Sequence, residues 1–223
     1  MSPFWLSIYV ASLALMVVLF TGTAMNYVMN RFHWKVLAFV EAVITLPLVL
    51  PPVVVGFALL MMFTPGYAFG AWLEAHGLGV VFSVTGAIIA SATIAFPLYY
   101  QSLRAALDAV DHSMEDVART LGASEWRIFY TISLPLAWRG LLSGAILSFC
   151  RAMGEFGATI LIAGNIPGLT RTMPLAIYSY AEALQYGDAF ELFMYICLLT
   201  LSLLCGIRLL TKGAIYGRHG RRH

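Results

Sequence analysis

Charged side chains are scarce along this chain, and five of them fall in residues 113–135, which include the run DVARTLGASEWRIFYTISLP. Glu115 and Asp116 would occupy the first turn of a helix, where their charge suits the positive end of the helix dipole. Gly122 then interrupts the helix, and Pro135 ends a second one. Apolar residues of the segment could form one stripe: Val117, Leu121 and Ile128. A polar, amphipathic segment between two hydrophobic stretches indicates a surface that a soluble partner binds.

A second group of charged residues lies inside a hydrophobic stretch. Arg151 and Glu155 are four residues apart, a spacing that allows an ion pair on one helix. Charges within a membrane usually face the interior of a helix bundle or water. We expect this pair to lock its helix in place; the alternative is that Arg151 adds positive potential for an anion. Gly154 and Gly157, beside the pair, would permit close helix packing.

Three prolines interrupt another hydrophobic stretch, TLPLVLPPVVVG. Pro47, Pro51 and Pro52 remove three backbone donors, and a helix broken within lipid must be completed by neighbouring helices or line a cavity. Because broken helices often build the substrate path of transporters, we favour a pathway-lining kink over a static one. Some hydroxyl groups could contact an anion, although each could instead bond to its own helix: Thr45, Ser91, Thr93, Ser148 and Thr159.

Motifs for nucleotide or catalytic chemistry are missing from the sequence. It has no GxxxxGK[ST] loop, no HExxH and no GxSxG. The three cysteines lie in hydrophobic stretches, where thiols usually behave as small apolar groups. We therefore expect no catalytic residue, no metal site and no cofactor in this chain.

Composition places the chain in a membrane. It is 61% hydrophobic and 11% charged, with a mean hydropathy of +0.84, whereas soluble domains carry about 25% charged residues. Uncharged runs at 2–30, 42–73 and 77–103 exceed the length of about 18 residues that marks a membrane span. We expect an all-α, polytopic membrane protein in which residues 1–223 form one transmembrane domain. Its predicted spans number about five: 3–26, 39–63, 81–103, 138–163 and 190–210.

The basic residues predict the orientation. Eleven of the thirteen Lys and Arg residues fall on one side of these spans; Arg171 lies on the other side, and Arg151 lies within a span. Because Lys and Arg favour the cytoplasmic side, the N-terminus is expected outside and the basic C-terminal tail in the cytoplasm. The bias also favours an odd number of spans.

Two connections, 65–79 and 165–187, would then lie outside. The second contains turn residues followed by a short helical pattern at about 174–184. Long ordered loops are often functional; the alternative is a helix that only lies at the outer membrane interface.

The segment 113–135 resembles a motif of the inner-membrane components of binding-protein-dependent ABC importers. That motif reads EAA, three residues, Gly, nine residues, then I-x-L-P. Both spacings are met here, with Asp in place of Glu and Val in place of the first Ala. The resemblance implies a cytoplasmic coupling helix that docks in a cleft of an ATPase subunit; the alternative is an interfacial helix without a partner. The residues expected to couple to the ATPase are Glu115, Asp116, Val117, Ala118, Gly122, Ile132, Leu134 and Pro135.

Three further segments narrow the resemblance: 45–56, 154–159 and 165–172. Together they resemble the permeases of molybdate ABC transporters, which belong to the same broader group as the sulfate and thiosulfate permeases. The candidates for the translocation pathway are Pro47, Pro51, Pro52, Gly56, Arg151, Gly154, Glu155, Gly157 and Thr159. The candidates for a loop that faces the binding protein are Asn165, Pro167, Gly168 and Arg171.

The resemblance also implies an assembly in the inner membrane. It consists of two copies of this chain, two ATPase subunits that carry Mg-ATP, and an extracytoplasmic oxyanion-binding protein, with no nucleic-acid partner. The anion would cross at the interface between the two copies by alternating access. The alternatives are tungstate, sulfate or another oxyanion as cargo, an ATP-independent secondary transporter, and a membrane enzyme or scaffold. A secondary transporter would be expected to carry inverted repeats, and the sequence has no convincing repeat.

Overall fold

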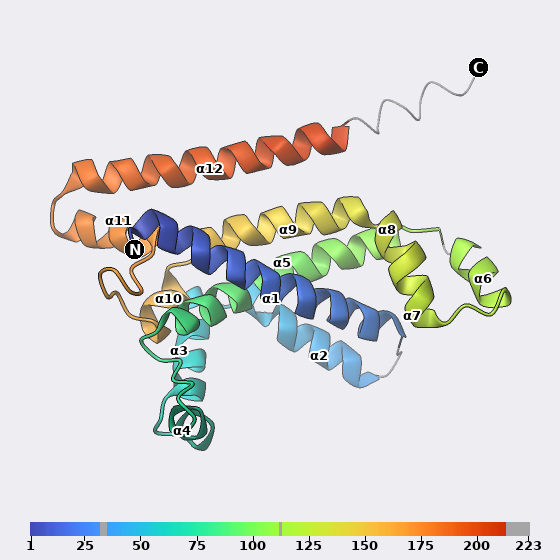
Figure 1. Cartoon of the computed structure of the whole chain (residues 1–223), viewed down its shortest axis with the longest axis horizontal. Coiled ribbons are helices and arrows are strands. Elements are labelled where there is room, and N and C mark those ends of the chain that lie inside the picture. Colours follow the sequence, from blue (N-terminus) through green and yellow to red (C-terminus); the bar gives the residue numbers. More distant parts are fainter. Residues whose placement is uncertain (32–34, 112, 213–223) are drawn as a thin grey trace.

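The computed structural model describes residues 1–31, 35–111 and 113–212, and these residues form helices and connections without a strand. Most of the helices run along one long axis (Figure 1). In chain order the elements are α1 Pro3–Arg31, α2 Lys35–Thr45, the 3₁₀ turn η1 Leu46–Leu48, α3 Pro52–Phe63, α4 Ala68–Ala75, α5 Val84–Asp108, α6 Ser113–Thr120, α7 Glu125–Ile128, the π turn η2 Phe129–Ser133, α8 Leu134–Leu136, α9 Trp138–Met153, α10 Gly157–Ile162, α11 Met173–Glu182 and α12 Tyr186–Lys212.

Small residues hold the central helices α1, α5 and α9 together. Ala11 and Ala14 of α1 and Ala95 of α5 are almost fully buried in one core cluster. A Cβ added to Gly140 of α9 would lie only 2.1 Å from Cβ of Ala106. Because lipid tails are as apolar as leucine, helices in a membrane associate largely through such close packing.

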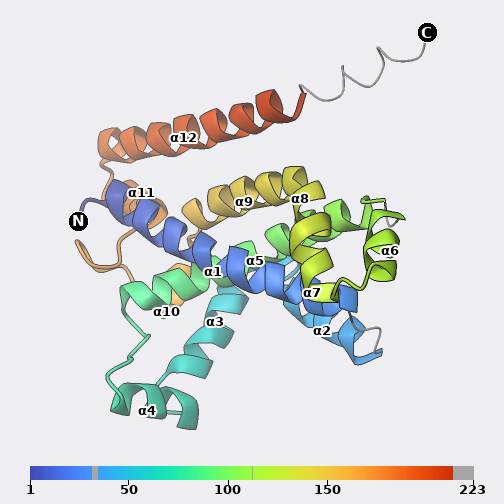
Figure 2. The same cartoon turned by 45° about the vertical axis from the view of Figure 1, so that its right-hand side comes forward.

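A second core cluster joins α3 and α10 to the N-terminal half of α5. Its fully buried members include Ala87, Ala90, Ala158 and Ile162, with Val55 contributed by α3. This cluster fixes two short helices, α3 and α10, that are not long enough to cross a bilayer alone. Beyond α3 the chain continues into α4, which projects from the body in both views (Figures 1 and 2).

The all-α membrane architecture is confirmed, whereas the number of spans stays a prediction. Among the described residues, α1 and the stretch Tyr186–Leu209 of α12 are long and apolar enough to cross a membrane, and the number rises to four if two sharply bent helix pairs each count as one span. The predicted third span corresponds to α5, a 25-residue helix in which Ala, Ser and Tyr residues are buried.

Two predicted spans are broken rather than continuous. The span predicted at 39–63 divides into α2 with η1 and, after a turn of 116°, α3. The span predicted at 138–163 ends as α9 at Met153, and α10 starts only at Gly157. The prolines explain the first break, because they remove backbone donors. The second break, between α9 and α10, could not be recognised from hydropathy, because Gly154 and Glu155 lie within an apolar run.

The helix α12 lies along one side of the molecule and packs on α11 and α9 (Figure 2). Its apolar side chains are largely exposed, among them Phe190, Leu198 and Leu201 at about 60%. Exposed apolar surface of this extent is suited to lipid or to another helix. The basic C-terminal tail on which the predicted orientation partly rested lies outside the described residues.

Several helix ends meet at one end of the long axis. There α1 and α5 finish, α9 begins, and α6, α7 and α8 gather beside the end of α1 (Figure 1). This end carries Arg31, Arg104, Arg119, Arg127 and Arg139, and it is called the basic end below. The helices α10 and α11 and the start of α1 lie toward the opposite end.

Candidate functional site

The segment 113–136 at the basic end folds as a pair of short helices, as predicted. Gly122 makes the turn between them with a φ of +81°, a conformation that glycine adopts without strain. Ser124 then caps α7 by accepting a hydrogen bond from the backbone N–H of Arg127 at 3.4 Å. The prediction that Pro135 ends this helix is wrong: Pro135 lies within α8, and the chain bends by 75° only after Leu136. The π turn η2 comes just before Pro135, whose missing N–H removes a normal helical bond.

Arg119 holds the two helices of this segment together. Its guanidinium contacts Asp116 at 2.6 Å and Glu115 at 3.4 Å, both on α6. Across the turn it donates to both carboxylate oxygens of Glu125 on α7, at 2.8 and 3.2 Å. Single exposed ion pairs contribute little, but one arginine that binds three carboxylates forms a network that fixes the angle of the turn.

Glu115 is the buried member of this network. Only 4% of the residue is exposed, and its Oε1 accepts a hydrogen bond of 2.6 Å from the hydroxyl of Ser133 in η2. A buried carboxylate must be paired or hydrogen-bonded, so this contact ties α6 to the helix that leads into α9. Glu115 therefore positions the segment and does not form its outer surface.

A polar cavity of about 450 Å³ lies between this segment and the end of α1. Tyr27, Asn30 and Arg31 line it from α1. The ring of Tyr27 also meets the rings of Trp126 and Phe129, each at 5.1 Å between centroids. The first helix thus contacts the segment directly.

Exposed apolar side chains follow one another along α6 and into the turn after it. Met114, Val117 and Leu121 are exposed by 57, 59 and 82%, and they follow one another at helical spacing. The predicted stripe was partly wrong, because Ile128 is only 1% exposed and packs inward. An exposed apolar stripe on a short helix is suited to burial against another protein.

The ion pair between Arg119 and Glu125 gives the segment a defined response to acid. Hydrogen bonds from Arg119 lower the pKa of Glu125. A lowered pKa contributes stability above the ordinary pKa of Glu, about 4.3, and this contribution is lost as the pH falls through the lower folded value. In a variant whose only tryptophan is Trp126, we expect fluorescence that is constant from pH 8 to about 5 and changes below about pH 4. Substitution Glu125→Gln should remove that acid transition. A fluorescence transition near neutral pH would contradict this prediction, and so would an unchanged acid transition in the Glu125→Gln variant.

The structure divides the predicted pathway residues among separate places. Gly56 of α3 lies against the backbone of α10, where an added Cβ would approach Cα of Ala158 to 2.6 Å. Pro52 and Gly157 belong to the same contact, with Cβ of Pro52 3.0 Å from a Cβ added to Gly157. Pro47, in contrast, lines a mostly apolar cavity of about 460 Å³ between α1, α2 and α5, while Pro51 precedes α3 and is exposed.

The predicted ion pair is present at the break between α9 and α10. Nη1 of Arg151 lies 2.8 Å from Oε2 of Glu155, whose side chain is 1% exposed. The other carboxylate oxygen accepts a hydrogen bond of 2.8 Å from the backbone N–H of Ala158. Glu155 thus pairs with Arg151 and satisfies a backbone donor in the first turn of α10, while Gly154 ends α9 at the surface.

The hydroxyl groups mostly bond to backbone. Thr45 and Thr93 donate to carbonyls of their own helices, and Ser148 donates to the carbonyl of Ala95. Thr159 differs: it is 1% exposed, and its hydroxyl has no hydrogen-bond partner among the described residues.

The loop 165–172 is held by internal hydrogen bonds. Asn165 accepts from Nε of Arg171 at 2.8 Å and donates to Ser179 of α11 at 2.6 Å. Pro167 and Gly168 are exposed at its tip. The short helix predicted at 174–184 is confirmed as α11.

Sequence reasoning missed Arg119 and Ser133 in the contact segment, and it missed the polar contact of Glu41 elsewhere in the fold. Arg119 and Ser133 lie inside the predicted coupling segment, but their partners come within bonding distance only once the chain turns at Gly122. Glu41 of α2 accepts a hydrogen bond of 2.9 Å from Tyr100 of α5. A carboxylate at the edge of an apolar run was a signal that could have drawn attention to Glu41.

Comparison with known proteins decides the family. The model of the family described as "Binding-protein-dependent transport system inner membrane component" matches residues 18–213. The chain belongs to this family. This inner membrane component is 44% identical over 178 residues to the molybdenum transport system permease protein ModB of Escherichia coli (strain K12), a match that covers 79% of this chain and 78% of the relative. It is 45% identical over 178 residues, 79% of this chain and 78% of the relative, to the putative molybdenum transport system permease protein YvgM of Bacillus subtilis (strain 168).

Solved structures share the fold of this inner membrane component. An inward-facing MetNI methionine ABC transporter structure matches with a TM-score of 0.66 and 15% identity, over 93% of this chain and 94% of the other. An amino acid ABC transporter matches with a TM-score of 0.65 and 17% identity, over 95% and 92%. The expectation that the chain is the membrane part of an ABC transporter is confirmed by the family and by this fold.

Proposed function

We propose that this chain is the membrane-spanning subunit of an ATP-driven importer that passes molybdate across the inner membrane. The observation that carries the proposal is the 44% identity to a molybdenum transport permease over most of both chains. Molybdate and tungstate are tetrahedral dianions of nearly the same size, so tungstate is expected to share the pathway. Sulfate is smaller and remains the second candidate.

In each of the two copies of the chain, the segment 113–136 is the proposed contact for one ATPase subunit, and the two ATPase subunits hydrolyse Mg-ATP. Its support is geometric: a helix pair set by Arg119 presents the apolar stripe Met114, Val117 and Leu121 outward. The basic end would then face the cytoplasm, as expected from the excess of Arg and Lys there. Two copies of the chain would enclose the anion, and the loop 165–172 would face an oxyanion-binding protein outside. For transport to follow, ATP and the loaded binding protein must favour the same one of the two states of the two-permease assembly.

Uptake into proteoliposomes tests this proposal. The chain would be purified with the ATPase and binding protein encoded beside it, and accumulation of radiolabelled molybdate would be followed with and without ATP. We expect accumulation only with ATP and with the binding protein, with tungstate competing and sulfate competing weakly. Uptake by the chain alone, indifferent to ATP, would contradict the proposal and favour a secondary transporter.

The same assay tests the contact segment. Substitution Arg119→Ala should release three carboxylates and loosen the helix pair, so we expect uptake to fall about tenfold or more and the ATPase to dissociate more readily. Arg127→Ala is the matched control, because Arg127 is an exposed arginine on the same segment. Equal uptake by both variants would argue against a role for the Arg119 network.

A further inference from the structure

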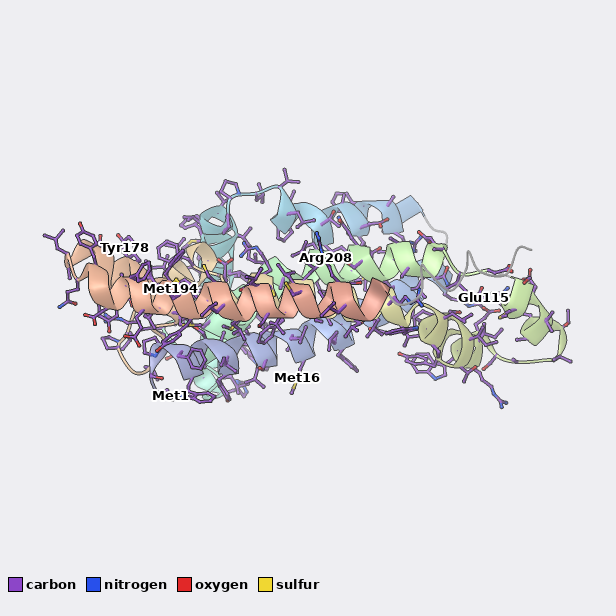
Figure 3. All side chains as sticks on the ribbon, turned by 90° about the horizontal axis from the view of Figure 1, so that it is seen from above. Met1, Met16, Glu115, Tyr178, Met194 and Arg208 are labelled. Atoms are coloured by element: carbon purple, nitrogen blue, oxygen red, sulfur yellow. The ribbon has the colours of Figure 1, made fainter. Side chains whose placement is uncertain are left out.

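The first helix runs along most of the long axis of the molecule and ends beside the segment 113–136. Figure 3 shows Met1 and Tyr178 near one end and Glu115 at the other, with Met16 of α1 between them. The helix α1 is continuous for 29 residues. From Ser7 to Tyr27 it covers about 30 Å at about 1.5 Å per residue.

At the basic end, α1 contacts the proposed ATPase-binding segment through Tyr27. The rings of Trp126 and Phe129 meet the Tyr27 ring edge to face, with interplanar angles of 86° and 64°. Trp126 belongs to α7 and Phe129 to η2, so this one side chain contacts both helical turns that follow Gly122. Edge-to-face packing has a preferred geometry, and a shift of α1 therefore changes the favoured position of the segment.

At the opposite end, α1 contacts the chain that leaves the proposed binding-protein loop. The hydroxyl of Ser7, 1% exposed, accepts a hydrogen bond of 2.7 Å from the backbone N–H of Met173. Met173 is the first residue of α11 and directly follows the loop 165–172. A movement of that loop is therefore passed to α1 through a buried hydrogen bond.

Between these two contacts α1 is fixed to α5. A Cβ added to Gly22 would lie 2.5 Å from Cδ1 of Tyr99, so the helices touch closely. The hydroxyls of Thr23 and Tyr99 lie 2.7 Å apart, and Asn26 donates to the carbonyl of Tyr100 at 3.3 Å. These contacts hold α1 against α5 along its C-terminal half, so α1 can move as one rigid helix. The alternative route through α9 includes the 75° bend after Leu136 and stops at Met153.

We propose that α1 mechanically links the external loop to the ATPase-binding segment, with Ser7 and Tyr27 as the positioning residues at its two ends. This inference rests on the proposed function, because it assigns a route between two of its partners. A loaded binding protein on the loop would favour one position of α1 and thereby one position of the segment 113–136. By linkage, occupancy of the segment changes the affinity at the loop by the same factor.

The test uses the complete complex in lipid vesicles and measures ATP hydrolysis with and without the molybdate-loaded binding protein. We expect Tyr27→Ala to retain basal hydrolysis and to lower the stimulation ratio about threefold or more. Tyr27→Phe should restore the ratio, because ring packing needs no hydroxyl. Tyr9→Ala, which truncates a half-exposed tyrosine of the same helix, is the matched control and should behave like the wild type.

A second pair of measurements keeps the inference testable if Tyr27→Ala assembles poorly. Ser7→Ala should also lower the stimulation ratio, and hydrogen exchange in residues 113–136 should rise although the change lies about 30 Å away. Thr21→Ala, whose hydroxyl donates to the carbonyl of Val17 in its own helix, is its control. Because both positions act through one helix, the double variant Ser7→Ala/Tyr27→Ala should lower the stimulation ratio no further than the stronger single change does.

The outcomes separate the two proposals. A wild-type complex that the loaded binding protein does not stimulate would overturn the proposed function. A stimulated wild type, together with unchanged stimulation in Tyr27→Ala and Ser7→Ala, would overturn the role of α1 alone. If the reductions in the stimulation ratio added up in the double variant, transmission through the single helix α1 would likewise be contradicted.

Discussion

Replacing Arg151 by alanine is expected to destabilise the protein by about 3–5 kcal/mol, the usual cost of leaving a buried charge without its partner. The carboxylate of Glu155 is 1% exposed, and Arg151 lies 2.8 Å from its Oε2. Without the guanidinium, that oxygen has no hydrogen-bond partner among the described residues. The free energy of unfolding in mixed micelles would measure the loss directly.

A second substitution shows whether charge is the cause. Glu155→Gln removes the charge but keeps an oxygen that can accept from the N–H of Ala158, the bond that supports the start of α10. We expect Arg151→Ala with Glu155→Gln to recover most of the lost stability. Glu155→Gln alone should cost less than Arg151→Ala, because the Arg151 side chain is 32% exposed and can still reach water. Arg139→Ala, an exposed arginine of the same helix, should change stability by less than about 0.5 kcal/mol.

Equal stability of Arg151→Ala and the wild type would show that the pair does not hold the break between α9 and α10. In that case the alternative raised from the sequence, a positive group that attracts the anion, would become the better account of Arg151. Uptake that falls without any loss of stability would support the same alternative.

The sequence predicted the helical membrane class and the coupling segment at 113–135 because both depend on local patterns. Long apolar runs have to cross or lie in a membrane. Gly122 stands where the chain needs a positive φ, and Ser124 is a favoured helix cap. The helix now seen at Met173–Glu182 followed from its turn residues and periodicity in the same way.

The directions of the helices could not be predicted, because hydropathy does not encode angles. The prolines at 47, 51 and 52 predicted a broken helix, but the 116° turn depends on how α3 packs against α10. The stop at Met153 was missed because a buried Glu155 supplies a bond that the interrupted helix would otherwise lack. Contacts such as Ser7 with Met173, 166 residues apart, arise only from the tertiary fold.

Replacing Gly56 by alanine should be the most damaging of three chemically identical changes. The added Cβ would lie 2.6 Å from Cα and 2.9 Å from the carbonyl oxygen of Ala158, and backbone atoms cannot rotate aside as a side chain can. The helices α3 and α10 would have to separate, at a cost of about 1–3 kcal/mol for an overpacked site. If this contact also lines the anion path, uptake should fall further than stability predicts.

Distance then ranks the other two glycines. A Cβ added by Gly157→Ala would lie 3.0 Å from Cβ of Pro52 and 3.2 Å from both Cγ2 and the backbone nitrogen of Val53. These contacts are tight but less close than those at Gly56, so a smaller loss is expected. Gly187→Ala in α12 meets nothing within 4 Å and should be neutral or slightly stabilising, because alanine favours a helix. Thermal unfolding and molybdate uptake of the three variants would test this order. If the Gly56→Ala variant were as stable and as active in uptake as the Gly187→Ala variant, α3 would not pack on α10 in the working protein. The helix α3 would then be free to move on its own.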